Sequence, residues 1–132
     1  MKYIILLFAM IFFHIVDDYY LQGILAQMKQ KKWWQENAPN KLYKNDYIMA
    51  LAEHAFSWSF MIHIPIFAFI YLCGVSVTWY GVALSVILNA FMHTYIDHKK
   101  ANLLQINLVQ DQLSHLSQIL FTWLAYCLIA IN

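Results

Sequence analysis

His93-Thr94-Tyr95-Ile96-Asp97 ends a strongly apolar run and sets an imidazole and a carboxylate four residues apart. On a helix, this spacing stacks both side chains on one face, one turn apart. The surrounding chain of 132 residues is 62% hydrophobic and only 11% charged, whereas about a quarter of the residues in soluble domains are charged. We therefore predict an all-helical membrane protein, and the length allows a single domain over residues 1–132.

Apolar runs separated by polar segments predict a bundle of four transmembrane helices. Each run is long enough to cross a hydrocarbon core, which takes roughly 20 residues. The expected helices cover about residues 3–28, 47–72, 77–99 and 103–131. The connection 29–46 is polar, and it holds lysine beside tryptophan, a combination typical of membrane interfaces.

The lysines predict how the chain lies in a membrane. All of them except Lys2 fall in or next to the connections after the first and third helices. Positively charged connections stay on the cytoplasmic side. We therefore expect a multi-pass protein of the cell inner (cytoplasmic) membrane, with the bilayer as its partner and both termini on the non-cytoplasmic side. The formal net charge of +1 provides no basic surface for nucleic acid.

The spacing of an imidazole and a carboxylate recurs twice elsewhere. His14 precedes Asp18 by four residues, and Asp111 precedes His115 by four. In the predicted orientation, every pair has its carboxylate nearer the cytoplasm and its imidazole deeper, at comparable heights. His54 in the second helix would complete the group. Charged side chains inside a bilayer are costly unless they are paired or face a cavity, so a functional role is the first expectation.

Imidazole nitrogen combined with carboxylate oxygen is a ligand set typical of zinc, manganese or iron. Such a set is too large for one tetrahedral ion, so we predict two divalent transition-metal ions. The predicted ligands are His14, Asp18, His54, His93, Asp97, Asp111 and His115. Two ions bridged by a carboxylate are the usual clamp for phosphoester hydrolysis. The alternative is a metal-free network in which the same side chains bond across helices and fix their packing.

Residues near these ligands are assigned further roles. Asp17 and Glu53 are predicted to be catalytic, either as a general base acting on bound water or by orienting a ligand imidazole. Gln22 and Asn89 share helix faces with the pairs and are predicted to support them by hydrogen bonds. The predicted contacts to a lipid headgroup or phosphate are Lys31, Lys32, Trp33 and Trp34.

Together the motifs resemble those of a known family. The resemblance rests on His14-x3-Asp18-Tyr19-x2-Gln22, His54 in an apolar helix, His93-x3-Asp97 and Asp111-Gln112-x2-His115. They are similar to a family of small bacterial and phage membrane proteins known as domain of unknown function 3307, over nearly the whole chain. The resemblance implies a membrane protein with a metal-binding or hydrolase-like polar core, and no more specific activity. This chain differs by having His98 after Asp97 and Asp17 beside Asp18, which leaves open which aspartate is the ligand.

These observations predict a metal-dependent hydrolase of a phosphoester at the cytoplasmic leaflet, with a phospholipid headgroup or a nucleotide as substrate. A second hypothesis is an ion or proton conductor that uses the same groups as a relay. It requires polar side chains through the outer half, where the sequence supplies only His63 and a few hydroxyls. A third is a non-enzymatic protein that binds another membrane protein. The oligomeric state is left open, a homo-oligomer included.

Overall fold

The computed structural model describes residues 1–131, and within this range the chain forms helices, turns and loops but no strand. The long helices are α1 (Lys2–Ile15), α4 (Asp46–Cys73), α5 (Trp79–Ala101) and α6 (Leu108–Ile129). The shorter ones are the π-helix η1 (Val16–Leu21), α2 (Leu25–Met28), α3 (Lys31–Asn37) and the 3-10 helix η2 (Lys41–Tyr43). The predicted all-helical class is therefore confirmed.

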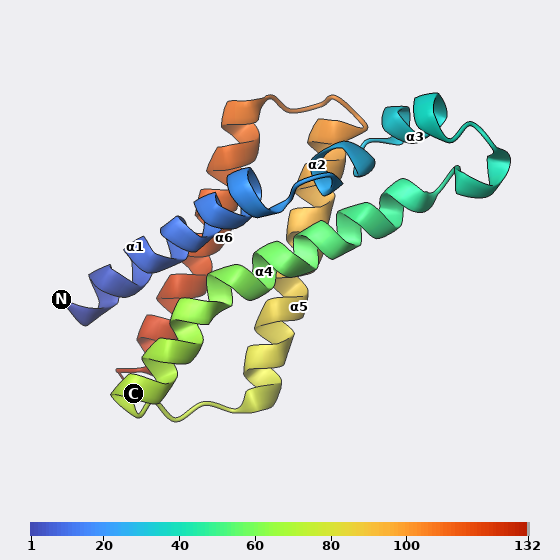
Figure 1. Ribbon diagram of the computed structural model, residues 1–132. Helices are drawn as coiled ribbons and strands as arrows, with labels where there is room; N and C mark the ends of the chain where they lie inside the picture. Colours follow the sequence, from blue (N-terminus) through green and yellow to red (C-terminus); the bar gives the residue numbers. More distant parts are fainter. Residues whose placement is uncertain (132) are drawn as a thin grey trace.

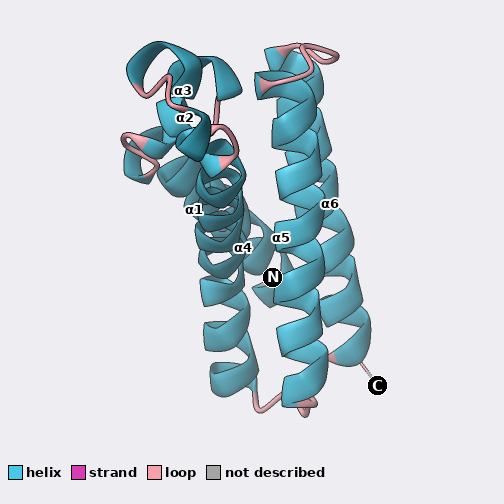
Figure 2. Ribbon diagram, turned by 90° about the vertical axis from the view of Figure 1, so that its right-hand side faces the viewer, coloured by secondary structure: helices cyan, strands magenta, loops and turns pink. Residues whose placement is uncertain are grey.

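The long helices lie side by side in a bundle (Figure 1). α4 packs against α1 and α5, and α6 packs against the same two helices. Figure 2 shows α2, α3 and the α5–α6 connection together at one end, with the α4–α5 turn at the opposite end. The end of α5 and the first turns of α6 therefore lie near α2. We call this the α2 end of the bundle.

The first expected helix, over residues 3–28, is interrupted in the structure. η1 continues α1 with a wider turn, in which the Gln22 N–H donates to the Asp17 carbonyl at 3.1 Å. The chain then turns at Gly23, which has a φ of 50°. Glycine adopts this left-handed conformation at little cost because it has no Cβ. The turn separates α2 from α1 and directs it across the end of the bundle.

The last helix begins at Leu108 and not near residue 103. Asn107 caps it: its side-chain oxygen accepts from the Gln110 N–H at 3.0 Å, and the Gln110 side chain accepts from the Asn107 N–H at 3.0 Å. This reciprocal capping box satisfies two N–H groups that the helix itself leaves free. Asp111 therefore lies in the first turn of α6, where the helix dipole favours a negative charge.

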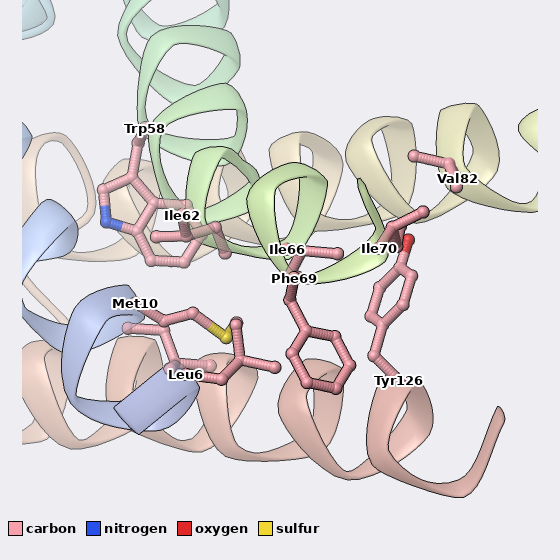
Figure 3. Close-up of a cluster of buried hydrophobic side chains, with 10 residues drawn as sticks. Leu6, Met10, Trp58, Ile62, Ile66, Phe69, Ile70, Val82 and Tyr126 are labelled. Atoms are coloured by element: carbon pink, nitrogen blue, oxygen red, sulfur yellow. The ribbon is translucent and has the colours of Figure 1, made fainter. Parts of the chain in front are cut away.

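Apolar side chains fill the half of the bundle away from the α2 end. Figure 3 shows Leu6 and Met10 of α1 lying next to Ile62 and Ile66 of α4. Ile119 of α6 belongs to the same buried group. Close packing of this kind tolerates little movement. It therefore holds α1, α4 and α6 at fixed separations where their polar residues meet.

Two helical stretches, Lys2–Leu21 and Lys41–Cys73, are long and apolar enough to cross a membrane. α5 and α6 do not pass the same test in the described part of the chain. Histidine, asparagine, glutamine and lysine interrupt their apolar runs. Four membrane spans, and both termini on the non-cytoplasmic side, stay predictions.

Candidate metal centre

Eight buried acidic and imidazole side chains meet toward the α2 end of the bundle. They come from α1, η1, α4, α5 and α6, and none is more than 7% exposed. We call them the polar cluster: His14, Asp17, Asp18, His54, His93, Asp97, Asp111 and His115. The structure thus brings together all the residues predicted as metal ligands, with Asp17 beside them.

His54 lies at the centre of one half of the polar cluster. Its Nε2 atom is 3.2 Å from Nε2 of His93. The same atom is 3.4 Å from Oδ1 of Asp18 and 3.4 Å from Oδ2 of Asp97. His54 has no acid one turn away on its own helix, and its carboxylate neighbours come from η1 and α5 instead.

His115 occupies the corresponding place in the other half. Its Nε2 atom is 3.4 Å from Oδ1 of Asp97 and 3.4 Å from Oδ1 of Asp111. On its far side, Nδ1 is 3.4 Å from the Gln118 side-chain oxygen, which can only accept a hydrogen bond. In a neutral ring Nδ1 therefore carries the proton, and the lone pair of Nε2 faces two carboxylate oxygens.

The ligand atoms form two overlapping groups. One contains Asp18, His54 and His93, the other contains His93, Asp97 and His115, and the atoms within each lie within 4.8 Å of one another. Zinc binds nitrogen and oxygen at about 2.0–2.1 Å in a tetrahedron, which separates the ligand atoms by about 3.3–3.4 Å. The observed separations of 3.2–3.4 Å around His54 match this edge length. These buried groups can therefore hold a metal ion.

Several polar atoms of the cluster have no hydrogen-bond partner within the described residues. They are Asp17 Oδ2, His54 Nδ1, His93 Nδ1, Asp111 Oδ1 and His115 Nε2. An unpaired buried polar atom costs about 1–3 kcal/mol. The last two of these atoms face each other across 3.4 Å. A cation between them would satisfy both at once.

His14 differs from the other imidazoles because both of its ring nitrogens are engaged. The Trp58 indole N–H donates to Nδ1 at 2.7 Å, so Nε2 carries the proton and donates to the Gln112 side-chain oxygen at 3.2 Å. The Gln112 amide nitrogen then donates to Oδ2 of Asp18 at 3.0 Å. In this arrangement His14 holds Asp18 in place through Gln112.

Asp17 and Asp18 lie on opposite sides of the His54 ring. Asp18 faces Nε2, the atom that points into the cluster, whereas Oδ2 of Asp17 is 3.9 Å from Nδ1. The Ser57 hydroxyl donates to the other oxygen of Asp17 at 2.6 Å and fixes its orientation. Asp18 is thus on the ligand side, and Asp17 is placed to orient the imidazole, as carboxylates behind metal-bound histidines do.

Two lysines pair with the cluster and were not predicted to reach it. Lys29 Nζ is 2.6 Å from Oδ2 of Asp97, and Lys100 Nζ is 2.5 Å from Oδ2 of Asp111. Each of these carboxylates directs its second oxygen toward His115. From the sequence, the lysines are expected to set the membrane orientation or to attract anionic phosphate, and the bend at residue 23 that brings Lys29 to the cluster has no counterpart in the expected helix over residues 3–28.

Trp58 and Gln112 were also missed, although the sequence holds a signal for each. Trp58 lies four residues after His54 and so shares its helix face, and its ring stacks on His93 with centroids 4.2 Å apart. Gln112 belongs to the motif that follows Asp111. Its contact with His14 joins α6 to α1, and such a contact between helices has no periodicity along the chain.

The predicted supporting residues lie at the edges of the polar cluster. The Gln22 amide donates to the backbone carbonyl of Asp18. Asn89 bonds Thr122 at 3.0 Å, and its backbone carbonyl accepts from the Gln118 amide at 3.3 Å. Because Gln118 also contacts His115, Asn89 supports the polar cluster indirectly, through Gln118.

Other predicted site residues lie outside the polar cluster. Glu53 is exposed on α4, about 100° around the helix from its neighbour His54, so the structure does not bring it to the predicted catalytic position. The residues predicted to contact a headgroup all lie on α3, and none of them belongs to the polar cluster. Lys32 pairs with Glu36 at 3.7 Å on the surface, and the Trp33 and Trp34 rings pack edge to face. Lys31 is exposed beside them.

No protein-family model, curated protein or solved structure matches this chain. The resemblance described above therefore stays a prediction, and the function has to be argued from the chemistry of the polar cluster.

Proposed function

We propose that this chain is a membrane-embedded metal protein that hydrolyses a phosphoester at the cytoplasmic leaflet. The proposal rests on two groups of buried nitrogen and oxygen atoms, one around His54 and one around His115. The atoms in each group are spaced like the ligands of a transition metal. A bound divalent ion would make water a stronger nucleophile and polarise a phosphoryl oxygen.

The charge of the polar cluster supports a cation. Its four carboxylates, when ionised, face only two ammonium groups, those of Lys29 and Lys100, and this leaves a formal charge of −2 with neutral imidazoles. Buried charge without compensation is strongly destabilising. One divalent ion restores neutrality. A second ion would be balanced by an anion, such as hydroxide or the phosphate group of a substrate.

The residues divide into two roles under this proposal. The ligands are Asp18, His54, His93, Asp97, Asp111 and His115. His14 and Asp17 hold ligands in position, through Gln112 and through the far side of the His54 ring respectively. Rigid support of this kind keeps reacting groups in a productive geometry.

The outer surface of the bundle supports placement in a membrane. Large apolar side chains cover faces that no other helix packs against, including Phe8 on α1, Phe91 on α5 and Phe121 on α6, each at least 67% exposed. Exposed aromatic rings in this number are unfavourable in water and favourable in lipid. They extend the membrane proposal to α5 and α6, and the lysine-rich connections support the proposed orientation.

The ion-conductor hypothesis is less well supported. It needs a continuous polar path through the bundle. Beyond the polar cluster, the described part of the chain has only a short series of buried polar side chains. His63 bonds the Ser59 carbonyl at 2.7 Å and the Ser85 hydroxyl at 2.9 Å. Around it lies the apolar core of Leu6, Ile62 and their neighbours, which is unfavourable for ions.

Elemental analysis of protein purified in detergent without chelators tests the proposal. We expect about two equivalents of zinc, manganese or iron per chain, and loss of most of this metal in the Asp97→Ala and His115→Ala variants. His98→Ala is the matched control, because His98 follows Asp97 but lies outside the polar cluster. Metal content that is unchanged in both cluster variants would overturn the proposal.

A further inference from the structure

A polar pocket opens beside the polar cluster at the α2 end. It has a volume of about 310 Å³ and is lined by Asp18, Gln22, Lys29, Lys100 and Gln112, with two tyrosines at its rim. Asp18 belongs to the candidate metal ligands, and both lysines bind cluster carboxylates on their other side. The pocket therefore connects the surface of the protein to the polar cluster.

The two lysines give this pocket the character of an anion site. An ammonium group has three donors, and Lys29 and Lys100 each use one on a carboxylate. Their side chains are 12% and 35% exposed, so the remaining donors are available on the pocket side. A phosphate oxygen would take up such donors in strong, charge-assisted hydrogen bonds.

An apolar groove continues from the polar pocket along the outside of the bundle. It has a volume of about 540 Å³, runs between α1 and α6, and includes Ile11, Ile15 and Leu116. It shares Tyr19, Tyr20 and Gln112 with the polar pocket. A single ligand can therefore occupy both, with a charged end in the pocket and a hydrocarbon part in the groove.

We infer that the polar pocket and the apolar groove together bind one membrane phospholipid with an anionic phosphate. The phosphate lies against Lys29 and Lys100, and an acyl chain lies along Ile15 and Leu116. This inference rests on the proposed hydrolase function and deepens it, because it selects a lipid over a nucleotide. A nucleotide would need polar partners for its sugar and base. Beyond the residues shared with the pocket, the groove offers Ile11, Ile15, Leu116 and His14, and both ring nitrogens of His14 are already hydrogen-bonded.

Lipid binding by the detergent-purified protein, followed by native mass spectrometry, tests the inference. The probes are dioleoyl phosphatidate, dioleoylglycerol, which lacks the phosphate, and adenosine monophosphate, which lacks the acyl chains. We expect phosphatidate to bind about tenfold more tightly than dioleoylglycerol, the size of one charge-assisted hydrogen bond. It should also bind more tightly than adenosine monophosphate, which has no acyl chain to bury in the groove. Equal or tighter binding of the nucleotide would overturn the inference.

Two variants separate the pocket from the groove. Lys100→Gln should remove most of the preference for phosphatidate over dioleoylglycerol, while Gln112 still bonds the Asp111 carboxylate. Leu116→Trp should fill the groove and weaken both lipids. Phe121→Trp is the control, because Phe121 lies about 140° around α6 from Leu116. Should Lys100→Gln fail to fold, Lys100→Arg must retain the preference.

Failure of the lipid-binding inference can be distinguished from failure of the proposed metal-dependent hydrolase. Protein that purifies with no transition metal, and still prefers phosphatidate, supports the lipid site and overturns the metal-dependent hydrolase. Metal-loaded protein that cleaves p-nitrophenyl phosphate, but binds phosphatidate equally well in wild type and Leu116→Trp, keeps the hydrolase and overturns the lipid site.

Discussion

At the scale of single residues, the His54 ring has a carboxylate facing each of its nitrogens. Asp18 lies on the side of the candidate ligands, and Asp17 lies 3.9 Å from the opposite nitrogen. The sequence placed both aspartates next to each other and could not say which would be a ligand. Their difference arises from the position of α4, which inserts the ring between them.

The Asp17→Asn variant tests this division of roles. Asparagine keeps the size of the side chain and removes the negative charge that would orient and polarise His54. We expect metal affinity to fall by about 10–100-fold, as for other residues behind a ligand, with the fold intact. Competition with a chromophoric chelator measures it. Asp46→Asn, on the first turn of α4, should leave the affinity unchanged, and an equal loss in both variants would contradict the role of Asp17.

At the scale of elements, the pairs of imidazole and carboxylate could be predicted because they depend only on helical periodicity. Residues 93 and 97 share a face in any α-helix. The contacts made by Lys29 and Gln112 could not be predicted from periodicity. They join residues of η1, α5 and α6 and the residue that follows α2, and they depend on how these helices cross. The start of α6 can also be predicted from the sequence, because Asn107 and Gln110 have the spacing of a capping box, which hydropathy alone does not reveal.

The turn at Gly23 decides where α2 lies, and its replacement is a test at this scale. Gly23→Ala introduces a Cβ at a φ of 50°, which costs about 1–2 kcal/mol. We expect a lower melting temperature, together with weaker metal binding, because the strained turn directly follows η1, which carries the candidate ligand Asp18. The two properties can be measured by thermal denaturation in detergent and by elemental analysis.

Gly74→Ala is the matched control for this variant. Gly74 has a φ of 63°, so the backbone strain is similar, and a Cβ there meets nothing within 4 Å. It lies after α4, at the end of the bundle opposite α2. The control should lower the melting temperature alone. A comparable loss of metal in both variants would show that Gly23 acts only through general stability.

At the scale of the whole molecule, composition predicted an all-helical chain correctly because 62% hydrophobic residues leave few other folds. Its orientation in a membrane depends on charge outside the helices and needs its own measurement. Cys73 is exposed at the end of α4, next to the turn into α5, whereas Cys127 is buried. The positive-inside rule predicts that this turn lies on the non-cytoplasmic side.

Labelling of the two native cysteines therefore reports the orientation. In intact spheroplasts, a membrane-impermeant maleimide should label the wild type and not the Cys73→Ala variant. A Lys31→Cys substitution in the Cys73→Ala background should be labelled only after permeabilisation, because α3 would face the cytoplasm. Labelling of Lys31→Cys in intact spheroplasts would reverse the proposed topology.

The two lysine–aspartate ion pairs also affect whether the protein folds before or after it binds metal. Lys29 and Lys100 each neutralise one acid from within the chain, which reduces the formal charge of the metal-free cluster from −4 to −2, and the apolar core packs the helices without an ion. On this basis we expect the chain to differ from small zinc domains, which stay unfolded until metal arrives. Loading would then be a late and reversible maturation step, and stripping the ions would yield an empty but assembled apoprotein.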